Sequence, residues 1–371
     1  MKIRGAVLER IGAPRPYGES RPITVGELDL ADPEPHEVLV RVEAASVCHS
    51  DLSVVDGNRV RPLPMLLGHE AAGTVLATGD AVADVEPGQR VILTFLPRCG
   101  ECRGCRTNGI APCERGSASN ATGEMLTGGT RLSRSGEPVL HHLGVSGFAT
   151  HAVVDRRSLV PVDAAVPAPV AAVLGCAVLT GGGAVINAAH PVPGMRVAVV
   201  GLGGVGMAAL ITALAHDGVE VSGVDSSPQK REQALALGAA AAYSPEEALA
   251  ALRADAVVEA VGRAVAFETA IGCTAAGGTT ISVGLPAPGD TATLSPLGLV
   301  AEGRTIVGSY LGSSVPERDL PLFVEMWRHG RLPVERLISS TVPLDHVNEA
   351  MEELAAGTQL RQVLDLTQEA L

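Results

Sequence analysis

The chain has 371 residues, of which 46% are hydrophobic and 19% are charged. A chain of this size and composition can bury a sizeable core in roughly two domains, which excludes a disordered protein, a collagen and a small disulfide scaffold. Lys and Arg number 28 against 41 Asp and Glu, a formal net charge of −13. Nucleic acids and anionic membranes bind basic faces, so we expect neither as a partner.

Short β-branched runs, interrupted by Gly and Pro, characterise the chain before about residue 180. They predict strands at Glu37–Ala45, Gly73–Leu76, Arg90–Leu93 and Thr150–Val154. We therefore expect an irregular, mostly-β domain over residues 1–177. The first ten residues contain no apolar stretch long enough for a signal peptide, so we expect a cytoplasmic protein.

Four cysteines lie close together in the pattern C-x2-C-x2-C-x7-C, at Cys99, Cys102, Cys105 and Cys113. Disulfides are disfavoured in a chain without a secretory signal. Four thiolates can close a tetrahedron around Zn²⁺ with no open position, which makes such a site structural. An iron–sulfur cluster also takes four cysteines, but no other feature of the chain suggests a redox partner for it. We predict a structural zinc site here.

A second metal site is predicted from residues that are far apart in the sequence. Cys48 follows a predicted strand, His69 stands between Gly68 and Glu70, and Cys176 lies more than a hundred residues later. Each alone is more often a packing residue than a ligand. Two Cys and one His, with one position left open, form a recognised catalytic zinc set. Cys273 lies on an Ala-rich, helix-like stretch and is interpreted as packing.

Two uncharged stretches, Ala164–Ala189 and Val197–Ala215, approach membrane-spanning length. Their density of Gly and Pro favours turns between buried elements, so we expect no membrane span.

A dinucleotide site is predicted within the second of these stretches. Met195–Val200 is typical of a buried strand and Met207–Ala215 of a helix; between them stand the residues of a G-x-G-x-x-G turn, Gly201, Gly203, Gly204, Val205 and Gly206. The glycines allow the pyrophosphate to approach the start of a helix. Asp225 ends the next predicted strand, Val219–Val224. A carboxylate there binds the adenosine ribose and favours NAD over NADP, although Asp225 also suits a helix N-cap.

Strands and helices continue to alternate after the glycine-rich turn. We expect helices at Pro228–Leu237 and Glu246–Arg253, and strands at Asp255–Glu259, Thr279–Val283 and Arg304–Gly308. This alternation indicates a doubly wound parallel sheet of the Rossmann type over residues 178–315. Residues 316–371 are expected to return to the first domain, through the segments Leu320–His329 and Leu344–Ala356 and a last strand at Gln362–Leu366.

Taken in order, these motifs resemble the zinc-dependent medium-chain alcohol dehydrogenases over essentially the whole chain. The resemblance rests on Cys48-His49-Ser50-Asp51, Gly68-His69-Glu70-x2-Gly73-x5-Gly79-x2-Val82, the four-Cys lobe, Leu174-Gly175-Cys176, the glycine-rich turn, Asp225 and Gly357-x3-Arg361. It implies a GroES-like catalytic domain beside the Rossmann domain, NAD as cofactor and two zinc ions. It also implies a homodimer formed through Arg304–Tyr310, with a tetramer as the alternative.

The resemblance assigns roles to individual residues. Cys48, His69 and Cys176 would hold the catalytic zinc, with Glu70 as a neighbouring carboxylate and Ser50 passing on the proton of an alcohol. Asp225 and Lys230 would bind the adenosine ribose, His49 and Arg361 the pyrophosphate, and Thr180 would lie beside the nicotinamide. The substrate pocket would include Arg59, Phe95, His142 and Leu143.

Two positions depart from the family pattern. Ser53 stands where many relatives have a histidine that ends the proton relay, so the relay beyond Ser50 is left open. Arg59 and His142 stand where relatives often have apolar residues. They could meet a polar or anionic substrate, or Arg59 could point to solvent from a loop.

The predicted function is the interconversion of an alcohol with its aldehyde or ketone by hydride transfer to or from NAD, with a small molecule as the substrate. One alternative is a formaldehyde dehydrogenase that acts on a glutathione or mycothiol adduct; His49 suits that branch, whereas Arg115 is not clearly in its anion-binding place. A non-catalytic NAD-binding or structural zinc protein is a second alternative, against which the open zinc site beside Ser50 argues. A zinc-free quinone reductase is disfavoured by the seven ligand positions.

Overall fold

The computed structural model describes residues 1–367, which form two compact units. The first comprises Met1–Thr107, Pro112–Cys176 and the chain from Val334 onward; the second comprises Asn108–Ala111 and Ala177–Pro333. Helix α11 (Pro316–Arg328) belongs to the second unit because it packs against α5 (Leu179–Ala184). The sequence predicted a return to the first domain at residue 316, whereas the boundary between these two units lies after Pro333.

The first unit contains a closed barrel in the order β1-β2-β7-β8-β4. Its strands are β1 (Lys2–Leu8), β2 (Ile23–Leu30), β4 (Met65–Leu66), β7 (Leu132–Arg134) and β8 (Glu137–His141). Apolar side chains from these strands, including Ile3, Leu28 and Leu66, fill its interior with almost no exposure to solvent. The barrel closes because β1 pairs with both β2 and β4.

A second sheet in this unit has the order β10-β6-β5-β3-β18-β17, with β9 also paired to β3. Its strands are β3 (Glu37–Val47), β5 (Glu70–Thr78), β6 (Arg90–Leu93), β9 (His151–Asp155), β10 (Leu159–Val162), β17 (Ile338–Pro343) and β18 (Arg361–Asp365). The helices of the unit are α1 (Tyr17–Ser20), α2 (His49–Val55), α3 (Glu114–Thr122), α4 (Ala168–Val173) and α12 (Val347–Ala356). The predicted irregular, mostly-β domain is confirmed.

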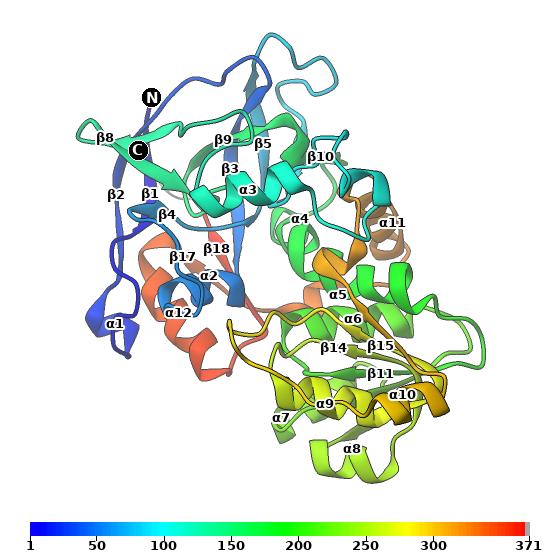
Figure 1. Ribbon diagram of the computed structural model, residues 1–371. Helices are drawn as coiled ribbons and strands as arrows, with labels where there is room; N and C mark the ends of the chain where they lie inside the picture. The colour runs from blue at the N-terminus through cyan, green and yellow to red at the C-terminus, as the bar shows by residue number, and fades with distance from the viewer. Residues whose placement is uncertain (368–371) are drawn as a thin grey trace. The chain divides into compact units, whose positions relative to one another are not determined.

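The second unit is built on a six-stranded parallel sheet in the order β13-β12-β11-β14-β15-β16. Figure 1 labels β11, β14 and β15 of this sheet. Its strands are β11 (Arg196–Val200), β12 (Glu220–Val224), β13 (Ala241–Tyr243), β14 (Ala254–Glu259), β15 (Thr274–Ser282) and β16 (Thr305–Gly308). The chain runs from β11 outward to β13 and then crosses to β14, so the strand order reverses between β11 and β14. Nucleotides bind at such a switch point in open α/β sheets. The predicted Rossmann sheet is confirmed.

The other helices of the second unit connect these strands. They are α6 (Gly204–Leu214), α7 (Pro228–Ala236), α8 (Pro245–Ala251), α9 (Ala264–Cys273) and α10 (Pro296–Ala301). The sheet buries Val, Ala and Leu side chains against them, among them Ala198, Val200 and Val257. Cys273 is fully buried in this core, in agreement with its interpretation as a packing residue.

A continuous helical run from Ala168 to Ala189 passes through α4 and α5. By length and composition it could cross a membrane, but 83% of its most apolar window is buried inside the protein. The expectation of turns here was wrong, because the glycine-rich part is helical. Gly181 and Gly182 lack side chains where α5 packs directly against α6, which explains glycines inside a helix.

Candidate metal and nucleotide sites

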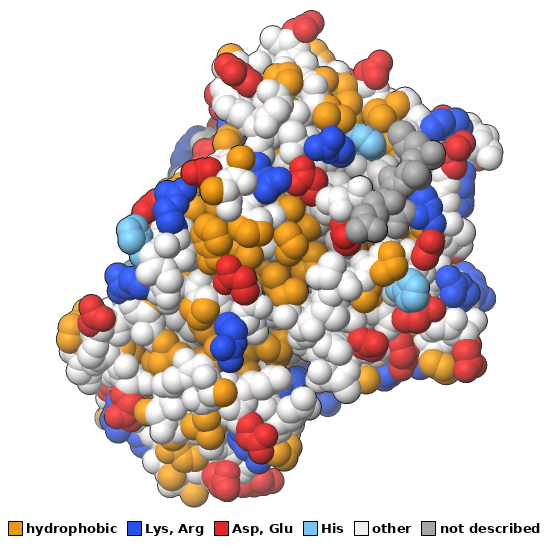
Figure 2. Space-filling model, turned by 180° about the vertical axis from the view of Figure 1, so that it is seen from behind, with side chains coloured by type: hydrophobic (Ala, Val, Ile, Leu, Met, Phe, Trp, Pro, Cys, Tyr) orange, Lys and Arg blue, Asp and Glu red, His pale blue; other side chains and the backbone are white. Residues whose placement is uncertain are grey.

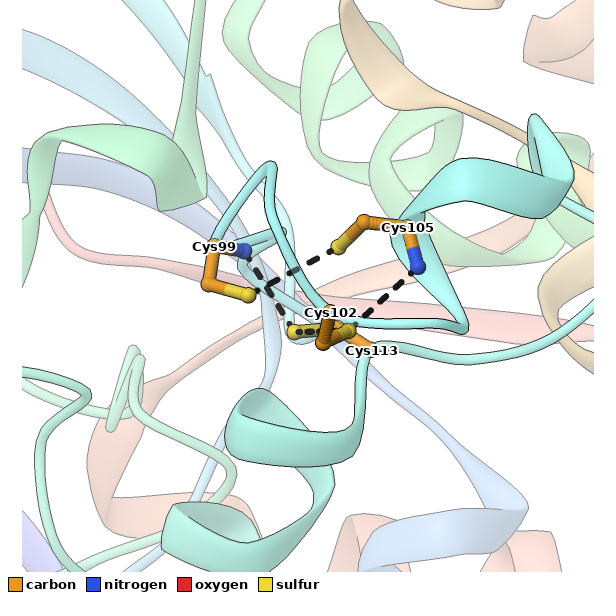
Figure 3. Close-up of side chains that lie close together, drawn as sticks. All are labelled: Cys99, Cys102, Cys105 and Cys113. Atoms are coloured by element: carbon orange, nitrogen blue, oxygen red, sulfur yellow. Dashed lines mark hydrogen bonds between the residues drawn. The ribbon is translucent and has the colours of Figure 1, made fainter.

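The four cysteines of the lobe converge on one point. The Sγ atoms of Cys99 and Cys105 lie 3.9 Å apart, as do those of Cys102 and Cys113 (Figure 3). All four sulfurs lie within 4.8 Å of one another. Two backbone N–H groups, those of Cys105 and Glu114, donate to the sulfur of Cys102 and lower its pKa to about 6. Converging sulfurs that receive backbone hydrogen bonds form a donor set suited to a tetrahedral zinc ion.

A second cluster of possible ligands is completely enclosed. The ligand atoms of Cys48, His69, Glu70 and Cys176 lie within 4.8 Å of one another, and all four residues are buried. Sheet register explains why two of them meet. Antiparallel β3 and β5 pair Ser46 with Glu70, so the end of β3 brings Cys48 beside the start of β5. Cys176 comes from the helical run that follows α4.

The two cysteines in this cluster interact directly. The hydrogen bond from Cys176, together with nearby charges, outweighs burial and holds the pKa of the Cys48 thiol well below its usual range. The same interaction, together with burial, raises the pKa of Cys176. One thiolate is therefore already favoured in this pair, and a cation would stabilise a second.

Gly68 fixes the position of His69. Its φ is +92°, and a Cβ at this position would lie 2.5 Å from the backbone nitrogen of Phe148, so only glycine fits. The His69 ring then points Nδ1 at Asp51, with Nδ1 and Oδ1 3.0 Å apart. Nε2 is buried and has no hydrogen-bond partner among residues 1–367. It lies 3.8 Å from Glu70 Oε1, beside the cluster of possible ligand atoms.

Glu70 and Arg361 form a buried ion pair next to these ligands. Arg361, the first residue of β18, places Nη1 3.1 Å from Glu70 Oε1 and 3.3 Å from the backbone oxygen of Val47. Burial raises the pKa of Glu70 to about 8, although the charge of Arg361 opposes this effect. Glu70 is thus the predicted neighbouring carboxylate. Arg361, which the family resemblance assigns to a pyrophosphate, has at least part of its guanidinium occupied by Glu70.

Asp51 contacts the predicted metal ligands Cys48 and His69 and also His142. Its Oδ2 accepts the backbone N–H of Cys48 at 3.0 Å, an arrangement that also caps α2. Its Oδ1 lies 3.0 Å from Nδ1 of both His69 and His142. Burial alone would raise the pKa of Asp51, but His69 and His142 outweigh it and lower the pKa to about 2. The carboxylate is therefore ionised, and it contacts two predicted zinc ligands, Cys48 through its backbone N–H and His69 through Nδ1.

The structure places the predicted pocket residues in different environments. Phe95 is 8% exposed and meets the His69 ring edge to face, with 5.4 Å between centroids. Leu143 is nearly buried, and its φ of +54° costs about 1–2 kcal/mol for a residue with a side chain. His142 is turned onto Asp51 and is only 1% exposed. Arg59 is partly exposed, and its backbone N–H donates to Ser53.

Three residues assigned by resemblance lie on helices. His49 is exposed and Ser50 is half-buried in the first turn of α2, next to Cys48. Thr180 is half-buried on α5 of the second unit.

The glycine-rich turn joins β11 to α6, as predicted. Asp225 follows β12, and its carboxylate accepts the backbone N–H groups of Leu202 and Ser227, each at 2.8 Å. It thereby holds the turn between β11 and α6. Lys230, on the first turns of α7, is half-buried. The predicted nucleotide residues of the second unit, apart from Thr180, thus gather at the carboxyl end of the central strands.

Sequence reasoning missed a further carboxylate in this unit. Glu259, the last residue of β14, is 1% exposed and accepts the backbone N–H groups of Val261 and Gly262 at 2.8 and 2.7 Å. A charged residue at the end of an apolar strand was the available signal. Glu259 fixes the loop that passes next to Gly201.

These features define a zinc-binding oxidoreductase with a GroES-like domain and a Rossmann-type sheet. Family models agree: residues 34–164 match the alcohol dehydrogenase GroES-like domain and residues 204–326 match the zinc-binding dehydrogenase domain. The chain belongs to the zinc-dependent alcohol dehydrogenase family of medium-chain dehydrogenases/reductases.

Solved structures match it over nearly its whole length. An alcohol dehydrogenase zinc-binding domain protein from Burkholderia ambifaria is 32% identical, with 99% of this chain and 100% of that chain covered and a TM-score of 0.91. Benzyl alcohol dehydrogenase from Acinetobacter calcoaceticus is 29% identical, with 98% and 99% covered and a TM-score of 0.90. Acetophenone reductase from Geotrichum candidum, solved with NAD, is 26% identical, with 98% and 97% covered and a TM-score of 0.77.

Proposed function

We propose that the protein is an NAD-dependent alcohol dehydrogenase that interconverts an alcohol with its aldehyde or ketone. The observation that carries this proposal is the buried cluster of Cys48, His69 and Cys176 with Asp51 behind His69. Glu70 and the half-buried Ser50 lie beside it.

The residues present fit a zinc ion. The two sulfurs of Cys48 and Cys176 and the imidazole nitrogen Nε2 of His69 form a set of three ligands that leaves a fourth position open. Of these, Nε2 has no hydrogen-bond partner in the described chain. When bound there, zinc would act as a Lewis acid toward an alcohol or carbonyl oxygen. The four-Cys lobe would hold a second, structural zinc.

The chain's own side chains would prepare this site in defined ways. Asp51 would accept a hydrogen bond from the Nδ1–H group of His69, which would leave Nε2 as the ligand atom. Arg361 places its guanidinium against the buried Glu70 carboxyl group, and its positive charge opposes the rise that burial causes in the Glu70 pKa. Ser50 would take up the proton of the alcohol and pass it toward solvent.

NAD is the nucleotide that we propose. Asp225 supports it, because a carboxylate at the end of β12 binds ribose hydroxyls and repels a 2′-phosphate. Lys230 would assist with the ribose, His49 and Arg361 with the pyrophosphate, and Thr180 would lie beside the nicotinamide.

A small molecule is the proposed substrate, in a cytoplasmic enzyme. The relative that acts on benzyl alcohol suggests an aromatic alcohol as the first compound to test. On the face shown in Figure 2, Lys and Arg side chains are interspersed with Asp and Glu side chains. That mixture gives no support on this face to a polyanionic partner.

The test combines metal analysis with turnover. We expect two zinc ions per chain and NADH formation from a free alcohol, with primary, secondary, aromatic and acid-bearing alcohols compared. Cys48→Ala should lose one zinc and fall below about a hundredth of the wild-type rate. Cys273→Ala, a change at a buried cysteine outside both clusters, is the matched control and should keep both metals. Two zinc ions with no turnover of any alcohol or aldehyde would contradict the proposal.

Formaldehyde with and without glutathione or mycothiol distinguishes the other enzyme function. Turnover only in the presence of thiol would assign the protein to the adduct branch. Arg115 pairs with Glu101 at the exposed surface, so nothing in its contacts favours a role in binding such an adduct.

A homodimer is also proposed. Strand β16 is the last strand of the second unit's sheet and pairs only with β15 among the described strands. Such an edge can pair with a second copy. The neighbouring helix α10 leaves Leu297 and Val300 77% and 79% exposed. Leu297→Arg should shift the mass measured by light scattering from dimer to monomer; a wild-type monomer would contradict this, and a tetramer would extend it.

A further inference from the structure

His142 contacts both Asp51 and His69 beside the buried cluster of possible metal ligands. Its Nδ1 lies 3.0 Å from Asp51 Oδ1, the same oxygen that receives Nδ1 of His69. The His142 and His69 rings also meet edge to face, with centroids 5.4 Å apart and an interplanar angle of 86°. All three residues are essentially without solvent exposure. One carboxylate oxygen is thus shared by two imidazoles.

The chemistry of this arrangement restricts the His69 ring. An ionised carboxylate only accepts hydrogen bonds, so His69 must present a protonated Nδ1 to Asp51. For His69 this leaves Nε2 as the ligand atom. The 3.0 Å contact of His142 Nδ1 with Oδ1 lies outside hydrogen-bond geometry, so His142 restrains Asp51 and His69 by close packing against both of them.

The backbone around His142 is built to hold this position. The His142 N–H lies within hydrogen-bond reach of Ser146 Oγ at 3.0 Å and of the Leu66 carbonyl at 3.2 Å. Ser146 Oγ in turn donates to the Leu66 carbonyl at 2.9 Å. Leu143 and Ser146 have φ values of +54° and +53°, which residues with side chains rarely adopt. Backbone strain of this kind persists where surrounding contacts enforce it, often beside functional sites.

We propose that His142 is a positioning residue for the metal ligand His69, acting through their shared contact with Asp51, rather than a residue that meets substrate. The inference rests on the proposed function, because it presupposes a metal ion at Nε2 of His69. It assigns His142 an effect on metal retention, for which changes in such outer partners typically cost 10–100-fold.

The experiment follows zinc release from the full-length, zinc-loaded protein into excess chromogenic chelator. Two kinetic phases are expected, and the phase that is missing in Cys48→Ser belongs to the catalytic site. His142→Phe keeps a ring but removes the nitrogen, and should accelerate that phase about tenfold or more while leaving the four-Cys phase unchanged. His142→Asn can present an N–H at the same place and should restore release to near the wild-type rate.

His141→Phe is the matched control. It removes a buried imidazole one residue away that accepts the backbone N–H of Arg131 and is not part of the Asp51 cluster. This variant should lower thermal stability without selectively accelerating the catalytic phase. If His142→Phe does not fold, His142→Leu takes its place.

Three results would overturn the inference: an unchanged catalytic phase in His142→Phe, equal acceleration of both phases, or His142→Asn releasing zinc as fast as His142→Phe. A wild-type protein with only the four-Cys zinc would instead contradict the proposed function, and the inference with it. Kinetics with a free alcohol separate failure of the inference from failure of the proposed function. If His142→Phe loses activity only because it loses zinc, added zinc should restore that activity.

Discussion

The glycine-rich turn allows a prediction that separates packing from nucleotide binding. A Cβ at Gly206 would lie 1.7 Å from the carbonyl oxygen of Gly201, and contacts under 3.0 Å essentially never occur. The start of α6 would therefore have to move away from the end of β11 by about 1.3 Å. Overpacking of this kind costs about 1–3 kcal/mol of stability. Because the obstacle here is a backbone atom, which cannot turn aside as a side chain can, we expect a cost of about 3 kcal/mol or more. A displacement of about 1 Å at a binding turn can also cost about 100-fold in function.

Gly203 is the internal control in the same motif. A Cβ there meets nothing within 4 Å, and its φ of −79° is open to any residue. Gly203→Ala should remain within about 1 kcal/mol of wild type in urea unfolding, whereas Gly206→Ala should lose about 3 kcal/mol. Titration calorimetry with NAD should nevertheless show weaker binding for both, because the open space at Gly203 is where we place the pyrophosphate. A Gly206→Ala protein as stable as wild type would refute the packing argument. A Gly203→Ala protein with unchanged NAD affinity would refute the placement of the pyrophosphate.

Three further predictions concern charge and metal. Asp225→Asn keeps one carbonyl acceptor for the backbone N–H groups but removes the charge, so kcat/KM for NADP relative to NAD should rise about tenfold or more; an unchanged ratio would exclude Asp225 as the selector. Cys113→Ser should lose the lobe zinc and lower Tm while the other zinc stays bound; metal analysis and calorimetry check this, and loss of both ions would contradict independent sites. Burial lowers the pKa of His141 to about 4, so the unfolded chain binds the extra proton below about pH 6.5 and the folded protein loses up to about 3 kcal/mol as the pH falls to about 4. His141→Gln should flatten that part of the pH dependence of the urea midpoint, and an identical slope would place the effect elsewhere.

The Rossmann sheet was predictable because its central strands β11, β12 and β14 are short, largely apolar runs that are almost entirely buried. Arg196–Val200 and Ala254–Glu259 agree with the expected strands within one residue. The barrel of the first unit was not predicted. Its strand β2 mixes Thr, Gly, Glu and Asp with buried Ile and Leu, and pairs from Ile23 to Asp29 with β1 and at its end with β7. Such strands are defined by their partners, and partners are not visible in a local pattern.

The residues that we propose as metal ligands stand out in the sequence by type, spacing and resemblance, and the structure gathers them in two clusters, but the contacts around those clusters were not predicted. His142 was assigned to the substrate pocket from its place in the family pattern. Its contact with Asp51 depends on a turn with two left-handed residues, which no propensity at Leu143 or Ser146 predicts. Asp51 and His142 are far apart in the chain, so no local sequence pattern shows that their side chains meet.

Asp51 shows why these outer contacts and the fold cannot be separated. The same carboxylate caps α2 through the N–H of Cys48 and orients His69 through Nδ1. Replacing it would leave the start of α2 without its cap, His69 without the acceptor that orients its ring, and His142 without the carboxylate that it contacts, so its loss cannot report on any one of these roles. His142 contacts Asp51 and His69 but takes no part in capping α2. That makes it the position at which metal retention can be perturbed while the helix that carries Cys48 stays capped, and the effect of His142→Phe on zinc release therefore measures the orienting contact itself.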